Sequence, residues 1–426
     1  MGVSIFEKID RSLGPLGAIS HFGHHYFSYP ILEGEIGPYM QFNGKKVLNW
    51  SLNNYLGLSN HPEVRAADAD AVSQFGLSYP MGSRMMSANS HYHERFEADL
   101  ADFSGYEDAF LMNFGYQGIM SVIETLVDHR DVIVFDSDSH ACLIDGIRLH
   151  KAKGGAYYKY NHNDMASLDL NLKRATKLSA QNGGGILVIT EGVFGMTGQV
   201  GKLDEIVAMK ERYDFKLLVD DAHGFGVMGK TGRGTPEHFG VQDQVDIYFA
   251  TFTKAMSAMG AFVGASSKVV KFLRYNVRSQ IYAKALPMGY VLGGIKRLEL
   301  IRENPQFRER LWYIAKKLQN GLIAEGFNLE TTNTHVTPVY FNQNFTQNEV
   351  GNMIIDLREN LNIFCSVVIY PVVAKGVVML RLIPTCMHTE EDVEYTINAF
   401  KQIREKLSQG EYNYEIPLKS EIYSNI

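Results

Sequence analysis

Cysteine is rare in this chain, with 3 among 426 residues. Cys142, Cys365 and Cys386 do not have the paired spacing of a metal site, and they form no disulfide pattern. This excludes a small secreted scaffold held together by disulfides, and it is typical of proteins in a reducing compartment. We therefore predict a cytoplasmic protein without a bound metal.

Long apolar runs and basic blocks are also missing. No apolar stretch reaches the roughly 18 residues that a membrane-spanning helix needs, and the N-terminus lacks a signal pattern. The formal net charge of -6 is spread over the chain, and no stripe of basic and aromatic residues is available to bind a nucleic acid. The sequence predicts a soluble protein with no transmembrane segment and no nucleic-acid partner.

Short apolar segments alternate with helix-like segments through the middle of the chain. They are apolar almost throughout, as parallel strands buried on both faces are, so we predict an open α/β sheet with ligands at the carboxyl ends of its strands. The predicted strands cover residues 131–135, 185–190, 216–219, 245–249 and 261–264.

The pattern divides the chain into three parts. Residues 1–60 form an N-terminal arm, rich in aromatic residues, that we expect to lie against a core or a partner subunit. Residues 61–290 form the large domain, and residues 291–426 form a smaller C-terminal α+β domain. In the small domain we expect strands at 336–341 and 377–382 and helices near 347–361 and 389–408.

The most informative run is 248–256, in which an apolar strand delivers Lys254 into a turn flanked by hydroxyl residues. An earlier strand ends in Asp220, and His223 follows closely. An acid and a histidine at one strand end, with a lysine at the next, suit pyridoxal phosphate (PLP). The acid pairs with the pyridinium nitrogen, the histidine reaches the phenolic oxygen, and the lysine forms the Schiff base. If this motif stood alone, an ordinary surface lysine would be the favoured interpretation of Lys254.

Two further segments follow apolar runs. Gly115 and Tyr116 open a predicted helix, whose first backbone amides can seat a phosphate, and glycine permits its close approach. His140 follows the predicted strand 131–135 and is either an ordinary loop histidine or a ring that stacks on the cofactor.

The chain resembles the α-oxoamine synthases, a group within the fold-type I PLP enzymes, over roughly residues 45 to 400. The resemblance rests on many short motifs in the same order along the chain. They are Asn53–Leu58, Gly82–Arg84, Ser139–Gly146, Asn161–Asp164, Glu191–Phe194, Asp220–His223, Thr251–Lys254, Leu380–Leu382 and His388–Thr389. The resemblance implies the fold of a PLP-dependent transferase, with a mostly parallel central sheet, helices on both faces and a smaller C-terminal domain.

The resemblance also implies roles for single residues. Lys254 would hold the cofactor and act as the base at the amino acid's Cα. Asp220 would keep the pyridine nitrogen protonated, His223 would bond the ring oxygen, and His140 would stack on the ring. Gly115 and Tyr116, helped by Thr251, would seat the phosphate.

The remaining implied roles concern the substrate and the subunit interface. Arg381 would hold the substrate carboxylate as a bidentate guanidinium fork, with Asn53 nearby. Arg84 is a further candidate for substrate binding. Lys284 would reach the phosphate site of the other subunit in a homodimer with shared active sites, although a solvated lysine is an equal alternative.

The implied reaction is a decarboxylating condensation of a small L-amino acid with an acyl thioester, presented by coenzyme A or by an acyl carrier protein. Serine palmitoyltransferases, 8-amino-7-oxononanoate synthases and glycine C-acetyltransferases are alternatives within the group. A PLP aminotransferase is the alternative from another reaction class, and the motifs Asn53–Leu58 and Gly82–Arg84 argue against it.

Departures from the group's pattern bear on the amino acid. Relatives read Phe-Ser-Met-Asp-Gly-Asp where this chain has Gly195, Thr197 and Gln199 at the serine and the two acids. Lys284 adds a cation. If all the charge changes face the site, the local charge rises, which favours a substrate with an extra anion. We therefore predict L-cysteate, the sulfonate analogue of serine, as the substrate in sulfonolipid synthesis, with L-serine in sphingolipid synthesis as the alternative.

Apolar side chains bear on the acyl group. Adaptable aromatic and methionine side chains suit a long acyl chain, unless they are simply core residues. They are Phe22, Tyr26, Phe27 and Tyr29 in the arm, with Met81, Met85 and Met86.

Overall fold

The computed structural model describes residues 26–341, 345–369, 373 and 376–414, together with Ser4, Phe6, Glu7 and Ile9. The strands are β1 (Leu32–Glu33), β2 (Tyr39–Phe42), β3 (Lys45–Asn49), β4 (Asp108–Met112), β5 (Val132–Asp136), β6 (Ala156–Tyr160), β7 (Ile186–Glu191), β8 (Lys216–Asp220), β9 (Ile247–Thr251), β10 (Ala261–Ala265), β11 (Thr337–Phe341), β12 (Ile363–Phe364), β13 (Ser366–Val368) and β14 (Val378–Leu382).

The α-helices are α2 (Pro62–Phe75), α3 (His91–Ser104), α4 (Gly115–Leu126), α5 (Ala141–Ala152), α6 (Met165–Asn182), α7 (Leu203–Ala208), α8 (Thr235–Phe239), α9 (Ser267–Asn276), α10 (Arg278–Ile281), α11 (Met288–Glu303), α12 (Pro305–Ala324), α13 (Gln347–Glu359) and α14 (Glu390–Ser408). Short turns of other helix types are η2 (Leu58–Asn60), η3 (Arg84–Ala88), η4 (Met209–Glu211) and η5 (Gln242–Gln244). Within the described ranges, no helix combines the length and apolar character needed to cross a membrane.

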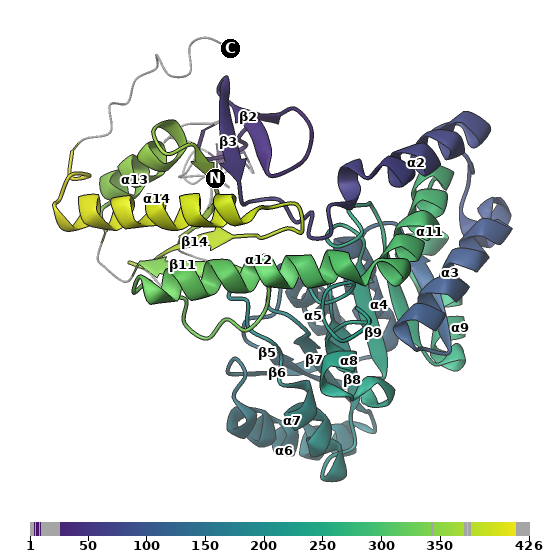
Figure 1. Ribbon diagram of the computed structural model, residues 1–426. Helices are drawn as coiled ribbons and strands as arrows, with labels where there is room; N and C mark the ends of the chain where they lie inside the picture. The colour runs from purple at the N-terminus through teal and green to yellow at the C-terminus, as the bar shows by residue number, and fades with distance from the viewer. Residues whose placement is uncertain are drawn as a thin grey trace.

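A seven-stranded sheet in the order β4-β10-β9-β8-β7-β5-β6 forms the centre of the large domain (Figure 1). Strands β5 to β9 run parallel to one another, whereas β10 is antiparallel to both β9 and β4. The predicted mostly parallel α/β sheet is therefore confirmed. Strand 261–264 was wrongly grouped with the parallel strands, because a short turn at Lys254 returns the chain beside β9.

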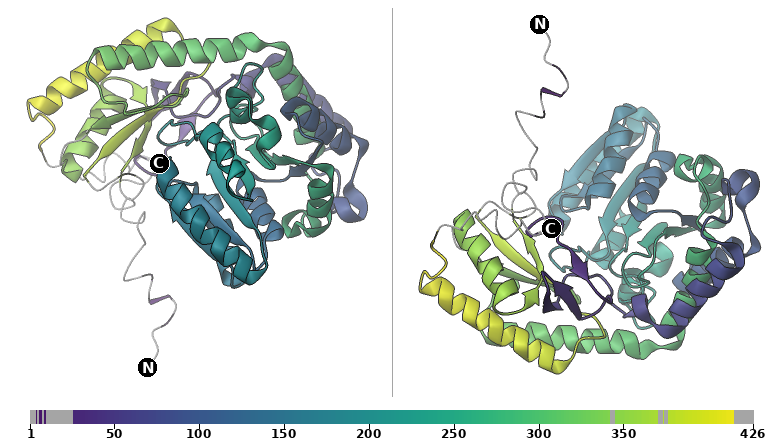
Figure 2. Two further views of the ribbon diagram at one scale, coloured as in Figure 1. Left: turned by 90° about the horizontal axis from the view of Figure 1, so that it is seen from below. Right: turned by 90° about the horizontal axis from the view of Figure 1, so that it is seen from above.

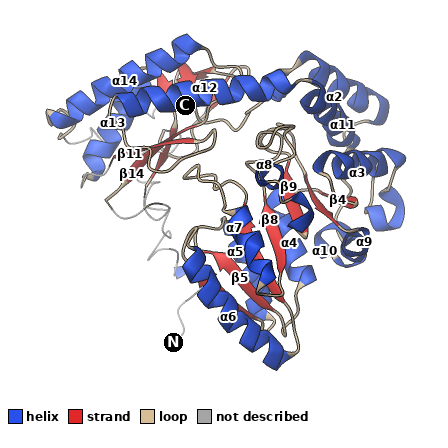
Figure 3. Ribbon diagram, turned by 60° about the horizontal axis from the view of Figure 1, so that its bottom comes forward, coloured by secondary structure: helices blue, strands red, loops and turns tan. Residues whose placement is uncertain are grey.

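Helices cover both faces of this sheet, as Figure 3 shows. Along β5, Ile133 and Phe135 pack in one core cluster with Leu143 of α5, while Val132 and Val134 pack in another with Leu172 of α6. Each strand thus buries side chains on both faces, which explains the unbroken apolar runs. Strand β6 was not predicted, because this edge strand alternates between more and less exposed residues.

The C-terminal region contains the sheet β11-β14-β13, covered by α13 and α14. The long helix α12 runs from the large part to the small one (Figure 2). Leu311 near its start packs in the large-domain core, and Leu318 and Leu322 pack in the small-domain core. Strand β3 pairs with β12, so the first described strands lie on the C-terminal region.

Candidate active site

Functional residues predicted from distant motifs gather at one edge of the large sheet. Glu191 ends β7, Asp220 ends β8 and Thr251 ends β9. Because these strands run parallel, their carboxyl ends meet at the same edge, and the register places Glu191 directly beside Asp220. Lys254 follows shortly after β9.

Lys254 lies in the turn that joins β9 to β10. The amide of Ser257 donates to the Lys254 carbonyl over 2.9 Å, and the Ser257 hydroxyl donates to Oδ1 of Asn54 over 2.6 Å. Burial lowers the pKa of Lys254, while Asp220 and Glu191 oppose that shift. A lysine with a lowered pKa has a larger neutral fraction, which is the nucleophilic form and the form that accepts a proton.

Two buried carboxyl groups face Lys254. Asp220 is 5% exposed and Glu191 is 6% exposed. Burial and the nearby Asp220 raise the pKa of Glu191 well above its usual range. Burial also raises the pKa of Asp220, against the attraction of Lys254 and His140. Two adjacent carboxyl groups resist ionising together, so the pair favours a single negative charge beside Lys254.

His140 is the N-cap residue of α5. Its Nδ1 accepts a hydrogen bond from the Cys142 amide over 3.3 Å and lies 2.9 Å from the Cys142 Sγ. Its own amide donates to Oε1 of Glu191 over 2.5 Å. Burial lowers the pKa of His140, Asp220 opposes the shift and Lys254 adds to it. The imidazole is therefore neutral near pH 7, with Nδ1 as an acceptor.

His223, Tyr55 and Arg381 form a second group beside Lys254. Nδ1 of His223 lies 2.6 Å from the Tyr55 hydroxyl, which is also 3.3 Å from Oδ1 of Asn53. Arg381, 8% exposed on β14, donates from Nε to the Gly195 carbonyl over 2.6 Å. Burial lowers the pKa of Arg381, and that of His223 falls well below its usual range through burial and the charges of Lys254 and Arg381.

The predicted phosphate seat lies where α4 begins beside β9. A Cβ on Gly115 would come within 2.8 Å of Oγ1 of Thr251, so only glycine fits this approach without a shift. Gly115 and Thr251 therefore lie together, as predicted. The Tyr116 side chain turns to α5, where its hydroxyl donates to Oδ2 of Asp145 over 2.5 Å. The amides at the start of α4 remain the phosphate-binding candidates.

Arg84 does not have the environment expected of a substrate ligand. Its guanidinium donates from Nη2 to Oε2 of Glu97 over 3.0 Å and from Nε to Oδ1 of Asn89 over 2.9 Å. Glu97 is 2% exposed and also pairs with Arg274 over 2.6 Å. The structure thus engages Arg84 with a buried carboxylate of its own chain, and its predicted role in substrate binding stays a prediction.

Lys284 is exposed, and its backbone carbonyl accepts a hydrogen bond from Nδ2 of Asn113 over 2.6 Å. The backbone of Lys284 therefore lies next to the residues that lead into α4. In the described part of the chain, no acidic side chain forms an ion pair with its ammonium group. Its predicted role in a second subunit stays a prediction.

The two changed acids lie in the turn after β7. Oε1 of Gln199 is hydrogen-bonded to Nε2 of His162, and Nε2 of Gln199 donates to Oγ1 of Thr331. Thr197 lies within the same turn, where its hydroxyl accepts from the Gln199 amide over 3.4 Å. Gln199 thus connects the large domain to the segment before β11, and its amide is already engaged.

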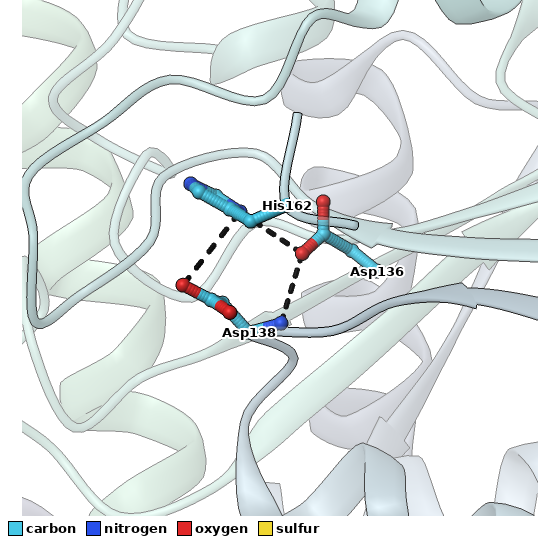
Figure 4. A group of neighbouring side chains, drawn as sticks. All are labelled: Asp136, Asp138 and His162. Atoms are coloured by element: carbon cyan, nitrogen blue, oxygen red, sulfur yellow. Dashed lines mark hydrogen bonds and ion pairs between the residues drawn. The ribbon is translucent and has the colours of Figure 1, made fainter. Parts of the chain in front are cut away.

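His162 belongs to a group with Asp136 and Asp138 that has the composition of a metal site (Figure 4). Nδ1 of His162 lies 2.9 Å from Oδ1 of Asp136, which also accepts from the Asp138 amide over 2.9 Å. Although burial opposes it, the carboxylate of Asp136 raises the pKa of His162. These groups satisfy one another as an ion pair, so the geometry does not call for a cation.

The predicted acyl-binding side chains differ in their exposure. Tyr26 is 2% exposed and packs in a core cluster with Phe42 and Phe364, with Phe27 beside them. These two rings are therefore core residues, whereas Tyr29 is 78% exposed. Met81, Met85 and Met86 are exposed at 72%, 45% and 82%. Phe22 lies outside the described residues.

Sequence reasoning named the motifs of Tyr55, Glu191 and Cys142 but gave these residues no role. Each lies next to a residue whose role was predicted, and the signal was available in part. Glu191 ends an apolar strand in the same way as Asp220, so its place at the sheet edge could have been inferred. The contact between Tyr55 and His223 joins residues far apart in the chain, which no local pattern indicates.

Comparisons with known proteins agree with this geometry. Residues 45–400 match the family described as Aminotransferase class I and II. The chain is 53% identical over 408 residues to a cysteate-C-fatty acyltransferase from Capnocytophaga ochracea, covering 96% of each chain. It is 36% identical over 366 residues to an 8-amino-7-oxononanoate synthase from Exiguobacterium sibiricum, covering 86% of this chain and 90% of the relative.

Among solved structures, a serine palmitoyltransferase from Sphingomonas wittichii superimposes with a TM-score of 0.87 at 26% identity, covering 96% of this chain and 99% of that chain. These relatives confirm the predicted group, its fold and its class of enzyme. The chain belongs to the α-oxoamine synthases, the PLP-dependent acyltransferases within the aminotransferase class I and II family.

Proposed function

We propose that this enzyme condenses a long-chain acyl thioester with L-cysteate, releasing carbon dioxide and a free thiol and forming a 3-keto sulfonolipid base. The observation that carries the proposal is the 53% identity, over 96% of both chains, to a cysteate-C-fatty acyltransferase. Arg381 is buried near Lys254 and forms no ion pair with any described carboxylate, which supports an acidic substrate at this place.

The residues at the sheet edge fit PLP. Asp220, which shares one negative charge with Glu191, would hold the pyridine nitrogen. His223 would donate a hydrogen bond to the ring oxygen. The α4 amides and Thr251 would hold the phosphate, where Gly115 leaves room. When bound, PLP supplies the electron sink for the pair left at the substrate's Cα.

The chain's own groups would then orient the substrate and move one proton. The Arg381 fork binds the substrate carboxylate and so fixes which Cα bond is broken. Lys254, whose pKa is lowered, takes the Cα proton at Nζ. The electron pair left at Cα would then attack the thioester carbonyl carbon and expel the thiolate. The resulting β-keto acid would lose carbon dioxide, and Cα would take back one proton.

The choice of cysteate rests mainly on the relative, because the structure weakens part of the charge argument. The Gln199 side chain turns to His162 and Thr331, which does not support the condition that this changed position faces the substrate. L-Serine is the second candidate, because serine palmitoyltransferases are among the structural neighbours. Whether coenzyme A or a carrier protein presents the acyl group stays open.

A substrate panel tests the proposal. Purified enzyme with palmitoyl-CoA is offered cysteate, serine, alanine and glycine, and carbon dioxide and free thiol are measured. We expect the highest kcat/KM with cysteate and a much lower value with acetyl-CoA. Serine turning over at least as efficiently as cysteate would leave a serine palmitoyltransferase, and equal rates with acetyl-CoA would remove the long-chain claim.

We also propose a cytoplasmic homodimer with shared active sites, organised as the arm 1–60, the large domain 61–290 and the small domain 291–426. Two segments with exposed apolar side chains run side by side, since the Ala285 amide donates to the Gly82 carbonyl over 2.8 Å. On them, Met81, Met86 and Tyr282 are 72%, 82% and 76% exposed, a surface suited to a second copy. Light scattering that found a fully active monomer would contradict this.

A further inference from the structure

Ser257 has a backbone conformation that is uncommon for a residue with a side chain. Its φ angle is 47°, which lies in the left-handed region that favours glycine. Residues other than glycine keep this conformation only where surrounding contacts stabilise it, and such outliers gather at functional sites. Ser257 comes three residues after Lys254, so this outlier lies in the turn that carries the proposed base.

Hydrogen bonds hold Ser257 in this conformation. Its amide donates to the Lys254 carbonyl over 2.9 Å, and its hydroxyl donates to Oδ1 of Asn54 over 2.6 Å. The Lys254 carbonyl is a second and longer acceptor for the same hydroxyl, at 3.3 Å. Oδ1 of Asn54 also accepts from the Ser59 amide over 3.2 Å, and a backbone amide can only donate. The atom that faces Ser257 is therefore the Asn54 oxygen, and the serine hydroxyl is the donor.

The same turn is also held at its base. The amide of the fully buried Phe252 donates to the Gly260 carbonyl over 2.9 Å, and its carbonyl accepts from the Ala258 amide over 2.9 Å. These bonds lie where β9 ends and β10 begins, so they keep the turn on its own sheet. The bond from the Ser257 hydroxyl instead reaches a segment far away in the sequence, before η2. Lys254 therefore lies between two points of attachment, one on the sheet and one outside it.

The segment around Asn54 also contacts residues predicted to bind the cofactor and the substrate. Tyr55 follows Asn54, and its hydroxyl lies 2.6 Å from Nδ1 of His223. The Tyr55 carbonyl accepts from the Cys386 amide over 2.9 Å, shortly after the strand that carries Arg381. A bond from the lysine turn to Asn54 thus connects the proposed base to the groups that would position the substrate.

We propose that Ser257 is a positioning residue, whose hydroxyl attaches the Lys254 turn to Asn54 and so keeps the lysine in its buried position. Burial is what lowers the pKa of Lys254. Without the hydrogen bond the strained turn relaxes, the lysine nitrogen gains contact with water, and its charged form is favoured. The bond belongs to the protein itself, and only its catalytic meaning rests on the proposed function.

Two substitutions at Ser257 separate the hydrogen bond from the backbone strain. Ser257→Ala removes the hydroxyl and keeps the strain, so this enzyme should have a lower Tm than the native one. Ser257→Gly removes both, so its Tm should stay close to the native value. Asn43→Gly is the matched control, because Asn43 has a φ angle of 49° and lies exposed between β2 and β3.

The first measurement is the absorbance of bound PLP in the holoenzyme as a function of pH, which reports how readily the nitrogen of Lys254 keeps its proton. A more hydrated nitrogen favours the charged form, so the midpoint should rise in both Ser257 variants and stay unchanged in the control. The kcat should fall about 10- to 100-fold with the KM of the amino acid near native, because a misplacement of about 1 Å costs on the order of 100-fold. A Ser257→Gly enzyme with the native midpoint and kcat would overturn the proposal.

Asn54→Ala tests the same hydrogen bond from its acceptor side. It should also raise the midpoint, and combining it with Ser257→Ala should raise the midpoint no further, because both changes remove one interaction. Additive shifts would mean that the two residues act separately, and they would contradict the proposal. Failure of the cysteate panel together with a raised midpoint in the Ser257 variants would reject the substrate and keep this inference.

Discussion

Arg84 is largely shielded from solvent and Arg381 is buried, and sequence motifs predicted both as substrate ligands. The Arg84 side chain is 11% exposed and pairs with Glu97, which a second arginine, Arg274, also contacts. Arg381 donates to a backbone carbonyl and lies near the Tyr55 hydroxyl, and no carboxylate of the described chain pairs with it. Similar burial therefore accompanies opposite electrostatic environments.

The difference separates structural charges from functional ones. A buried ion pair whose partners lie within the chain has no remaining capacity for a ligand. A buried guanidinium without a counter-ion bears the cost of desolvation until an anion binds, and such residues mark binding sites. Lys254 and the pair of Glu191 and Asp220 belong to the second kind, since burial shifts their pKa values and, among the described residues, none of them forms a direct ion pair.

Lys254→Ala should have the largest effect on the functional region. We expect activity to fall by about a thousandfold or more, because both the covalent attachment and the base are lost. Borohydride reduction followed by peptide mapping should label Lys254 in the native enzyme and leave the variant unlabelled. Reduced cofactor attached to another lysine in the variant would contradict the assignment of Lys254 as the attachment site.

Asp220→Asn and Glu191→Gln should differ although the residues are neighbours. Removing the charge of Asp220 should lower kcat by about a hundredfold or more, the usual cost of losing one preorganised electrostatic group. Burial and the nearby Asp220 raise the pKa of Glu191 well above the usual range, which favours its neutral form, so the neutral glutamine should cost less than about tenfold. Steady-state kinetics on both variants, matched for cofactor content, checks this. Equal losses would mean that Glu191 carries the charge.

Buried neutral histidines should make the fold sensitive to acid. Burial lowers the pKa of His93 and His388 to about 4 and that of His335 to about 3. Below pH ~6.5 these histidines bind protons in the unfolded chain but stay neutral in the folded one. Their contribution to the free energy of unfolding is therefore complete above that pH and is lost as pH falls toward ~4. Urea unfolding at several pH values should show this slope. His388→Gln should flatten it by about one proton, and an unchanged slope would contradict the assignment.

The smallest effect should come from the exposed Lys284. Replacing it by threonine should weaken PLP binding less than about fivefold, because exposed charges contribute little. Added salt should reduce the difference, if Lys284 acts through charge in the partner's phosphate site. Fluorescence titration of the apoenzyme with PLP measures this effect. A loss that does not respond to salt would favour a packing role instead.

Much of the site could be predicted because it lies directly after apolar strands. Parallel strands bring their carboxyl ends together, so Asp220 and Lys254 could be placed in one site from their positions alone. Which side chains contact each other across the fold could not be predicted in the same way. Nothing near Arg84 in the sequence shows that Glu97 of α3 folds back onto it, and Tyr26 gives no local sign that Phe364 covers it.

A paired measurement on Arg381→Met and Arg84→Met tests the comparison most directly. For each variant, the KM for the amino acid and the free energy of unfolding are measured on the same preparation. Arg381→Met should raise KM by about 10- to 100-fold with little loss of stability, because a charged hydrogen bond to the substrate is removed. Arg84→Met should leave KM near the native value and cost about 3 kcal/mol of stability, because Glu97 loses one of its buried partners. The reverse pattern, with Arg84 controlling KM and Arg381 controlling stability, would contradict the account.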